Sequence, residues 1–330
     1  MHARHRPSIS FIVPVRNGRR TLARCLRSIA ANDYPRDRVE IIVADNGSTD
    51  GSRDLGRAAG AIVLDLPNLS PAELRNRAAG VASGRVLAFV DADHEIASDW
   101  ITSALDALSG QSVGAAGAQY HPPSPATWVQ RGYDALRGHV TGRRDVEWIG
   151  SGNLAVWKSV FERIGGFEPA LVTCEDVDFC RRLRATGFRI IADDRLHTTH
   201  FGDPRTLAEL FRGELWRGRD NLRVTLRRPL SLRSLASLVV PAADLVLIGA
   251  VTGAAVWGGP QRAALVAVAS GAAILTFAAL RTFAKLRAST LTAIELGQVL
   301  VVAAVHDVAR AFALMFRARH TMRQAPGSVR

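Results

Sequence analysis

The 330-residue sequence is poor in cysteine and lysine, and it contains no internal repeat and no low-complexity tract. Its three cysteines, Cys25, Cys174 and Cys180, are odd in number and spaced like no metal site, so we expect free thiols in a reducing compartment. Because lysine is nearly absent, arginine supplies most of the net charge of +12. A hydrophobic content of 48% excludes a disordered, collagen-like or disulfide-stapled protein.

We do not expect the N-terminal residues to form a secretory signal. The basic stretch Met1–Pro7 is followed by an apolar run of only Ile9–Val15, which is too short for the core of a signal peptide. No small-residue cleavage site follows this run. We therefore expect the N-terminal part of the chain to stay in the cytoplasm.

Short β-branched runs alternate with helical stretches up to about Phe201. The strands are expected at Ile9–Val15, Val39–Ala44, Ala61–Leu64, Val86–Val90 and Arg189–Ala192. The helices are expected at Arg19–Ala31, Asp50–Ala59, Pro71–Ala82, Ser98–Leu108 and Val177–Thr186. Unbroken apolar strands that alternate with helices predict a doubly wound α/β domain, with a mostly parallel sheet covered on both faces, over residues 1–202.

The composition changes after this domain. Arginine and apolar residues interleave over residues 203–235, which predicts basic amphipathic helices at a membrane surface. Ser237–Trp257 and Ala263–Leu280 are about 31 and 27 Å long as helices, against a hydrocarbon thickness of about 30 Å. The turn Gly258-Gly259-Pro260 joins them. We expect a transmembrane hairpin, because little other chain is available to cover two buried core helices.

The basic residues predict how the hairpin is oriented. Arg233 precedes the first span, and Arg281, Lys285 and Arg287 follow the second, whereas the loop between the spans holds only Arg262. The positive-inside rule therefore places both ends of the hairpin in the cytoplasm.

A third apolar stretch, Leu291–Phe316, is amphipathic. Glu295, His306, Arg310 and Arg317 fall within about 60° on a helical wheel. A third helix lying at the interface agrees with this polar face and with the basic tail, residues 317–330. A third true span, the less favoured alternative, would place that tail outside. Residues 236–316 are thus expected to hold the hairpin and a third membrane-associated helix.

Polar residues follow the first two predicted strands. The segment Val13–Gly18 lacks the Gly-x-Gly-x-x-Gly loop of a dinucleotide-binding fold. The second strand ends at Asp45, where a carboxylate can accept hydrogen bonds from a base N–H or a ribose hydroxyl. Ser48 and Asp50, in the same stretch, can equally be turn or cap residues.

Two carboxylates flank one residue at the end of the fourth predicted strand, in Asp91-Ala92-Asp93. Ionised carboxylates at the mouth of a buried strand need a counter-charge, which a divalent ion supplies. An oxygen-ligated Mg²⁺ or Mn²⁺ would bridge diphosphate oxygens. The alternative is a capped strand end with solvated acids.

These segments together resemble the family 2 glycosyltransferases, which have the GT-A fold. The resemblance covers about Ser8 to His200 and rests on motifs in the expected order. They are Val13–Gly18, Asp45–Asp50, Arg75-Asn76, Asp91-Ala92-Asp93, Gly150-Ser151-Gly152-Asn153, Glu175-Asp176 and His200.

The resemblance implies a nucleotide-binding role for five matched positions. Pro14, Arg16 and Asp45 would line the nucleotide pocket, with Asp45 at the base. Arg75 would lie near the nucleotide, and Asp91 would lie near the ribose.

It also implies residues for the donor sugar and the metal. Gly152 and Asn153 would let the backbone approach the donor sugar, as glycine allows. Asp93 would bind Mg²⁺ or Mn²⁺, with His200 as a further contact to the metal or the diphosphate. His197 lies close in sequence and competes with His200 for this role.

Glu175 and Asp176 are the implied catalytic residues, with Asp176 as the general base. Attack by a sugar hydroxyl on an anomeric carbon needs a carboxylate to take the proton. A metal that stabilises the leaving diphosphate removes the need for a general acid, so one inverting displacement is expected. His94 departs from the family pattern, which has a small or acidic residue after the aspartate pair.

The resemblance therefore implies a metal-dependent inverting glycosyltransferase in the inner membrane, with its catalytic domain in the cytoplasm. Its partners would be a nucleotide-sugar donor, membrane lipids, and a hydroxyl acceptor on a lipid-linked or cell-envelope glycan. One alternative transfers sugar to polyprenyl phosphate, but a phosphate is already ionised and needs no base. A non-enzymatic, basic membrane or nucleic-acid-binding protein is the other alternative. The positive charge gathers beside the apolar spans and no nucleic-acid motif appears, so we expect no nucleic-acid partner.

Overall fold

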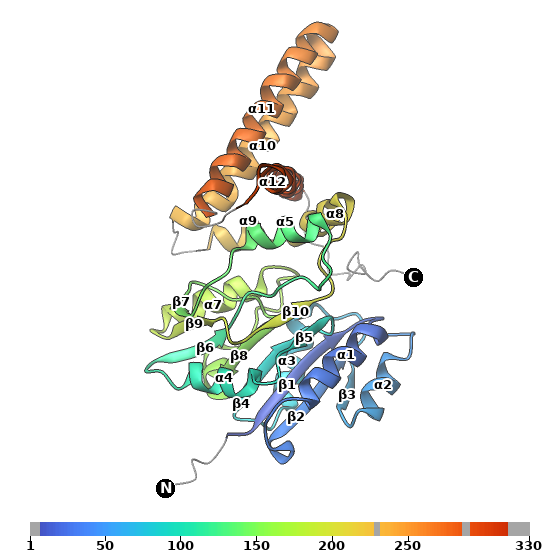
Figure 1. Cartoon of the computed structure of the whole chain (residues 1–330), viewed down its shortest axis with the longest axis vertical. Helices are drawn as coiled ribbons and strands as arrows, with labels where there is room; N and C mark the ends of the chain where they lie inside the picture. The colour runs from blue at the N-terminus through green and yellow to red at the C-terminus, as the bar shows by residue number, and fades with distance from the viewer. Residues whose placement is uncertain (1–6, 228–231, 286–290, 316–330) are drawn as a thin grey trace. The chain divides into compact units, whose positions relative to one another are not determined.

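Strand β1 (Ile9–Val15) lies inside an eight-stranded sheet with the order β3-β2-β1-β4-β8-β6-β9-β7 (Figure 1). The computed structural model describes residues 7–227, 232–285 and 291–315. By their contacts they divide into two units. The first contains the sheet and comprises residues 7–123 and 139–203, and the second is helical and comprises residues 124–138 and 204–315.

The sheet is mixed, with a parallel half and a partly antiparallel half. Strands β3, β2, β1 and β4 are parallel, β8 runs antiparallel to both β4 and β6, and β9 is parallel to β6 but antiparallel to β7. A separate two-stranded sheet pairs β5 with β10. The remaining strands are β2 (Val39–Asp45), β3 (Ile62–Asp65), β4 (Val86–Val90), β5 (His94–Ile96), β6 (Val113–Gly117), β7 (Arg143–Asp145), β8 (Asn153–Trp157), β9 (Arg189–Asp193) and β10 (Thr198–His200).

Helices cover both faces of the large sheet, as a doubly wound fold requires. They are α1 (Arg19–Ala30), α2 (Ser52–Ala58), α3 (Pro71–Val81), α4 (Trp100–Leu108), α6 (Lys158–Ile164) and α7 (Glu175–Ala185), with a short 3₁₀ helix η1 (Arg36–Arg38). One buried cluster packs α1 and α4 against the sheet, and a second packs α3, α6 and α7 against the opposite face. The predicted α/β class is therefore confirmed.

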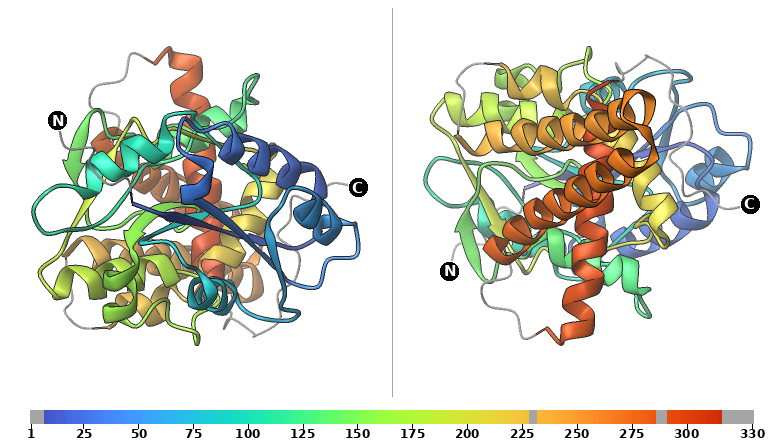
Figure 2. Two further views of the ribbon diagram at one scale, coloured as in Figure 1. Left: turned by 90° about the horizontal axis from the view of Figure 1, so that it is seen from below. Right: turned by 90° about the horizontal axis from the view of Figure 1, so that it is seen from above.

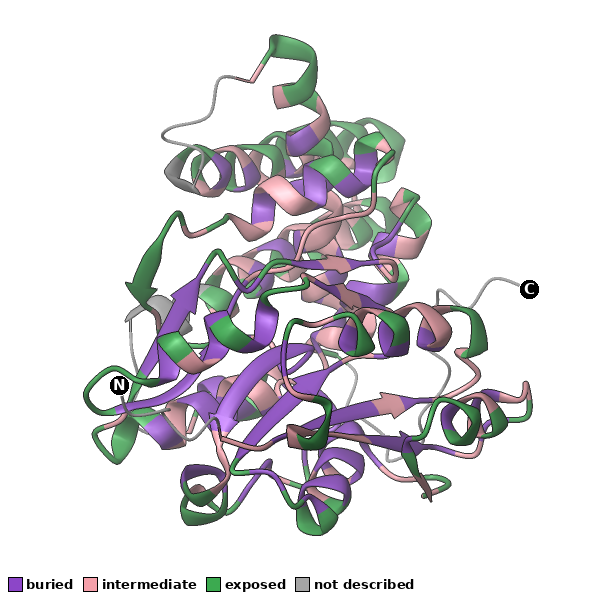
Figure 3. Ribbon diagram, turned by 60° about the horizontal axis from the view of Figure 1, so that its bottom comes forward, coloured by how far each residue is buried: buried purple, intermediate pink, exposed green. Residues whose placement is uncertain are grey.

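The two cores follow from the alternation of side chains along each strand. In β4, Ala88 belongs to the first core, whereas its neighbour Phe89 belongs to the second. Phe89 packs against the rings of Phe161 and Phe167, with centroid separations of 5.2 and 5.1 Å. Figure 3 shows the central strands as almost wholly buried. These strands read as continuous apolar runs because both of their faces are covered.

The parallel strands β1, β2 and β4 end at one edge of the sheet. Val15 pairs with Asp45 at the last residues of β1 and β2. In open α/β sheets, ligands bind outside the carboxyl ends of the strands. This edge therefore holds the candidate site.

The second unit consists of helices. They are α5 (Trp128–Arg137), α8 (Leu207–Arg217), α9 (Asn221–Thr225), α10 (Leu232–Trp257), α11 (Gly259–Lys285) and α12 (Ala293–Ala313). Residues 124–138 fall in this unit, although the sequence interpretation counted them with the α/β domain. The physical reason is that Tyr133 and Leu136 of α5 share one apolar cluster with Leu210 of α8 and Val302 of α12.

Among the described residues, three helices are long and apolar enough to cross a membrane. They are Ser237–Trp257, Gly259–Phe283 and Ala293–Ala313. α10 and α11 lie side by side as the expected hairpin, and α12 packs on both of them (Figure 2). Their apolar side chains are widely exposed, for example 72% for Val246 and 74% for Val268. Such exposed apolar surface fits lipid contact, and the three helices support a membrane-anchored protein.

Within the predicted amphipathic segment, residues 203–235, the structure describes α8, α9 and the start of α10, and residues 228–231 lie outside the described part. The buried face of α8 includes Leu210 and Glu214. Glu214 accepts hydrogen bonds from Tyr133, Arg217 and Arg310 at 2.6, 3.0 and 2.7 Å. One face of α8 thus packs on the other helices of its own unit.

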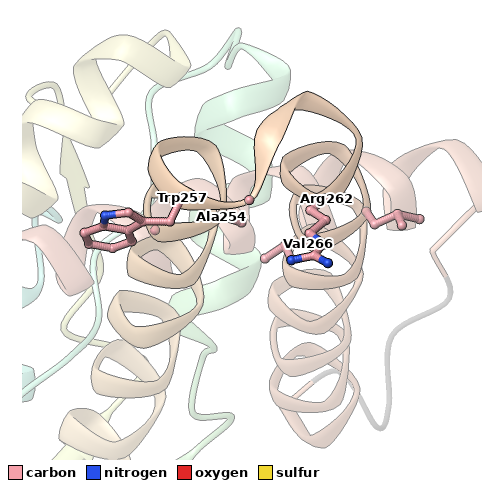
Figure 4. Close-up of a pocket in the computed structure, with 7 residues that line it drawn as sticks. Ala254, Trp257, Arg262 and Val266 are labelled. Carbon is pink, nitrogen blue, oxygen red and sulfur yellow. The ribbon is translucent and has the colours of Figure 1, made fainter.

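A hollow lies at the turn end of the hairpin (Figure 4). Its lining residues are Gly253, Ala254, Trp257, Gly258, Arg262, Leu265 and Val266. They include no acidic or nucleophilic side chain, so this hollow offers no catalytic chemistry.

Candidate active site

The carboxylate of Asp45 closes the end of β2 and is fully buried. Its Oδ1 accepts a hydrogen bond from the backbone N–H of Ser48 at 2.8 Å and lies 3.7 Å from Arg53 Nε. Its Oδ2 is buried and has no hydrogen-bond partner among the described residues. A buried carboxylate oxygen without a donor is costly, so this atom is suited to receive an N–H from a ligand.

The loop after β2 holds the loop after β1. The backbone N–H groups of Asn17 and Arg19 donate to Ser48 Oγ at 2.9 Å and to Asp50 Oδ2 at 2.9 Å. Asp50 also accepts from the hydroxyl of Ser52 at 2.6 Å. Ser48 and Asp50 therefore act as loop and cap residues in this structure. Pro14 and Arg16 lie half-buried at the same sheet edge.

Arg75 is a buried bridge between two acidic residues. From α3, its Nη2 donates to Asp91 Oδ1 at 2.6 Å, and its Nη1 donates to Glu175 Oε1 at 3.0 Å. Asp91 follows β4 and Glu175 begins α7. The guanidinium therefore holds the acids of two separate motifs together.

Helix α7 begins at the acid pair. Cys174, at its N-cap, has a left-handed backbone with φ of 60°, which is uncommon outside glycine and marks local strain. The carboxylate of Asp176 accepts hydrogen bonds from the backbone N–H of Val177 at 2.8 Å and of Ser151 at 3.4 Å. The hydroxyl of Ser151 also lies 3.4 Å from Glu175 Oε1. The backbone thus fixes the direction of the Asp176 carboxylate.

Burial dominates the electrostatics of this pair. Burial and the neighbouring charge of Asp176 raise the pKa of Glu175 to about 7, against the opposing charge of Arg75. Burial also raises the pKa of Asp176, although the backbone N–H of Val177 and the charge of Arg75 favour its ionised form. A carboxyl group with a raised pKa is a common feature of sites that transfer protons.

Asp93, His94 and His200 bring their ligand atoms within 4.8 Å of one another. His200 Nε2 lies 3.3 Å from Asp93 Oδ2, and His94 Nε2 lies 3.9 Å from Asp93 Oδ1. The other ring nitrogen of His200, Nδ1, lies 2.8 Å from Asp203 Oδ1. A carboxylate on the far nitrogen of an imidazole is the usual support for a metal-binding histidine.

The charges in this cluster are tightly coupled. Although burial opposes the charge on Asp93, His200 holds the pKa of that carboxyl well below its usual range. Burial likewise opposes protonation of His200, but Asp93 and Asp203 raise its pKa to about 10. Burial and the nearby His200 lower the pKa of His94 to about 4. One carboxylate and two imidazoles form a donor set that fits a divalent cation.

Glycines let the backbone approach both the Glu175–Asp176 pair and the Asp93–His94–His200 cluster closely. A Cβ on Gly152 would lie 2.6 Å from Asp91 Oδ2 and 2.8 Å from His94 Cε1, so no side chain fits there. A Cβ on Gly150 would touch Asp176 Oδ2 at 3.7 Å and the ring of Tyr120 at 3.9 Å. The motif that contains both glycines therefore borders the acid pair on one side and the aspartate–histidine cluster on the other.

The structure shows where Asn153 and the two candidate histidines lie. The side chain of Asn153 is fully buried, donates to the carbonyls of Ala118 and Leu196, and accepts from Trp100 Nε1 at 2.8 Å. It therefore holds β8 in the core, and only its backbone stays near the site. His197 is exposed and stacks on another histidine, while His200 lies beside Asp93, so the structure separates the two histidines that the sequence left open.

Four residues of the site were not assigned from the sequence. They are His94, Tyr120, Ser151 and Asp203. Tyr120 packs on His200, with ring centroids 4.7 Å apart. Asp203 stands three residues after His200, a spacing that could have suggested its supporting role. Tyr120 carries no comparable signal, because only the fold brings it to the histidines.

Comparison with known proteins indicates the family and the fold. Residues 10–167 match the model of the family Glycosyl transferase family 2. The glycosyltransferase AglE of Haloferax volcanii is 26% identical over 247 residues, which cover 71% of this chain and 79% of that protein. The pre-mycofactocin glycosyltransferase of Mycobacterium tuberculosis is 25% identical over 195 residues, which cover 55% of this chain and 40% of that protein.

Solved structures share the fold. The mannosyltransferase PcManGT from Pyrobaculum calidifontis, in complex with GDP-Man and Mn²⁺, has a TM-score of 0.64 at 23% identity, covering 92% of this chain and 88% of that chain. This similarity shows the GT-A fold. The family match, the curated glycosyltransferase relatives and this fold lead to one conclusion: the chain contains a family 2 glycosyltransferase domain and is a sugar-transferring enzyme.

Proposed function

We propose that the enzyme transfers a sugar, with inversion, from a nucleotide-sugar donor to a hydroxyl group of a lipid-linked or cell-envelope glycan. The observation that carries this proposal is that a candidate base and a candidate metal-binding cluster lie at the same edge of the sheet. Asp176 offers a carboxylate held by backbone N–H groups, and the Asp93–His94–His200 cluster offers ligands for a cation. Gly150 and Tyr120 connect the two groups.

The buried, unpartnered Oδ2 of Asp45 supports binding of the donor's base. A base with a ring N–H would satisfy this oxygen, and Pro14 and Arg16 border the same edge. The mannosyltransferase with the same fold was crystallised with GDP-Man, which supports a nucleotide sugar as the donor class. Asp91, held by Arg75, would face the ribose.

Asp93 and His200 would hold Mg²⁺ or Mn²⁺. When bound, the ion would neutralise the diphosphate as it leaves. The crystallised neighbour contains Mn²⁺, which supports this cofactor class. Asp203 would keep the Nε2 atom of His200 directed at the ion.

Asp176 would act as the general base. The acceptor oxygen would attack the anomeric carbon while its proton passes to the carboxylate, and the bond to the diphosphate would break on the opposite face. One displacement with one base inverts the anomeric centre, and no second carboxylate nucleophile is needed. Glu175, paired with Arg75, would position this helix start rather than take the proton.

The alternative acceptor is polyprenyl phosphate. Its oxygen is already ionised at neutral pH, so the Asp176 carboxylate would have no proton to take. Two backbone N–H groups that aim this carboxylate favour the hydroxyl acceptor. The family assignment sets aside a non-enzymatic, basic binding protein.

We further propose that the catalytic unit works at the cytoplasmic face of the inner membrane. Arg233, Arg281 and Lys285 gather at the two ends of the hairpin, whereas the turn holds only Arg262. The positive-inside rule then places both ends in the cytoplasm. α12 either spans the membrane or lies at its surface beside the hairpin.

A panel of nucleotide sugars tests this function. Full-length enzyme in detergent should release nucleoside diphosphate from one donor with Mn²⁺ or Mg²⁺, and excess chelator should stop the reaction. Asp93→Ala should lower turnover on the order of 10³-fold or more, since a catalytic metal supplies several kcal/mol. The control is Asp99→Asn, which changes an exposed aspartate shortly after Asp93 in the chain and should leave the rate unchanged. Full turnover in chelator would contradict metal dependence.

A further inference from the structure

The residue that departs from the family pattern, His94, stands opposite His200 in the structure. β5 and β10 pair antiparallel, and the register places His94 directly across from His200. Residues that face each other across two strands point to the same side of the sheet. Their ring centroids lie 4.6 Å apart. Because Asp93 comes immediately before His94, the pairing brings a carboxylate and two imidazoles together.

The imidazole of His94 is buried and makes no hydrogen bond to the residues that the structure describes. Its exposed fraction is 1%. Nδ1 has no hydrogen-bond partner among the described residues, and Nε2 lies 3.9 Å from Asp93 Oδ1, beyond hydrogen-bond distance. Buried polar atoms in native proteins nearly always have a partner. Nε2 is the ring nitrogen beside Asp93, so a cation bound by that carboxylate would give Nε2 a partner.

The backbone at Gly152 and Gly202 packs closely against the side chains of Asp93, His94 and His200. A Cβ on Gly202 would lie 2.1 Å from Asp93 Oδ2 and 2.8 Å from His200 Nε2, and a Cβ on Gly152 would lie 2.8 Å from His94 Cε1. Ligands at about 2.1 Å from one ion stand about 3 to 4.2 Å from each other. The 3.3 and 3.9 Å separations from Asp93 to the two histidines fall in this range.

We propose that His94 is a third protein ligand of the catalytic cation, beside Asp93 and His200. This inference rests on the proposed metal-dependent function and deepens it by naming the metal preference. Imidazole nitrogens bind transition metals better than Mg²⁺, which prefers oxygen and water. Two imidazoles and one carboxylate should therefore select Mn²⁺ or Co²⁺ over Mg²⁺.

A packing role for His94 makes a different prediction. The ring also contacts Tyr120, with centroids 5.0 Å apart, so an aromatic side chain alone could serve the core. His94→Phe keeps a ring of similar shape and removes both nitrogens. His94→Asp keeps a ligand but exchanges nitrogen for oxygen. His197→Phe is the matched control, because His197 is exposed and stacks on another histidine.

Metal binding to the full-length protein in detergent, without donor, tests the proposal. Wild-type protein should bind Mn²⁺ at least ten-fold more tightly than Mg²⁺ in calorimetry. His94→Phe should weaken Mn²⁺ binding on the order of 10- to 100-fold with little effect on Mg²⁺, and His94→Asp should restore binding with a shift toward Mg²⁺. His197→Phe should bind like wild type. A folded His94→Phe protein with unchanged Mn²⁺ affinity would overturn the proposal.

Pulsed electron paramagnetic resonance on wild-type protein with Mn²⁺ gives a second readout that needs no variant. Coupling to two imidazole nitrogens supports His94 as a ligand, and coupling to one overturns it. A different result would contradict the metal-dependent function itself. If the wild-type protein binds neither ion and turns over in chelator, the proposed metal dependence is wrong. If Asp93→Ala abolishes binding while His94→Phe does not, only the assignment of His94 is wrong.

Discussion

Arg75 Nη1 lies 3.0 Å from Glu175 Oε1, and this buried ion pair ties helix α3 to the first turn of α7. The same guanidinium also binds Asp91 at 2.6 Å. Removing one partner from a buried ion pair leaves the other charge uncompensated. Arg75 therefore holds the acid pair in position, and its positive charge favours the ionised forms of both acids.

Substitution of Arg75 should change the pH dependence of the reaction. The positive charge of Arg75 opposes the rise in the pKa of both Glu175 and Asp176, so Arg75→Gln should raise these values further. The base acts only when it is deprotonated, and activity rises as pH rises through the apparent pKa of the coupled pair. The acid limb of the kcat/KM profile should move to higher pH.

Arg77→Gln is the control, because Arg77 is exposed on the same helix. Its pH profile should match that of the wild type. If Arg75→Gln changes only the KM for the donor and leaves the acid limb in place, then Arg75 acts on the nucleotide and not on the acid pair.

Glu214 should be essential for the stability of the helical unit. It is fully buried and accepts hydrogen bonds from Tyr133, Arg217 and Arg310. Glu214→Ala leaves two arginines without this partner and should lower the free energy of unfolding by about 3–5 kcal/mol. Thermal unfolding in detergent measures the change. Arg212→Ala, on the exposed face of α8, should have little effect, and an equal loss in both variants would contradict the account.

The same residue predicts an acid dependence of stability. Burial opposes its charge, yet Arg310, His306 and Arg217 hold the pKa of Glu214 well below its ordinary value. A carboxyl whose folded pKa is lowered stabilises the fold above its unfolded pKa and loses that contribution as pH falls. Wild-type stability should therefore decline in acid more steeply than that of Glu214→Ala.

Labelling of a single introduced cysteine tests the topology. Gln261, at the exposed turn of the hairpin, should lie outside the cytoplasm, so an impermeant maleimide should label Gln261→Cys in sealed right-side-out membranes. Ser109→Cys, exposed in the catalytic unit, should react only after the membranes are opened. The reverse pattern would contradict the proposed orientation.

The central strands were predictable because they are buried on both faces. β1 and β4 match the predicted bounds, since continuous apolar runs are the direct consequence of two covered faces. β5, β7 and β10 have three residues each and contain polar side chains, so no periodic sequence pattern predicts these strands. α5 had a usable signal, the capping box of Thr127 and Gln130, which the sequence interpretation did not use.

The positions of the candidate site residues in the fold were predictable only where a motif stands at a strand end or a helix start. Asp45, Asp91, Asp93 and the acid pair follow that rule. The contact of His94 with His200 depends on the pairing of two short strands far apart in the chain, which local sequence does not encode. The core position of Asn153 likewise depends on Trp100 and on carbonyl groups that only the fold brings to it.

The rate of sugar transfer by Asp176→Asn tests the account most directly. Asparagine keeps the shape of the side chain, and its single oxygen can still accept the shorter hydrogen bond, from the Val177 N–H, but the amide cannot take a proton. With a hydroxyl acceptor, kcat should fall by on the order of 10²–10⁴, while donor affinity and thermal stability stay near those of wild type. Near-normal kcat from a folded Asp176→Asn enzyme on a hydroxyl acceptor would contradict the assignment of Asp176 as the base.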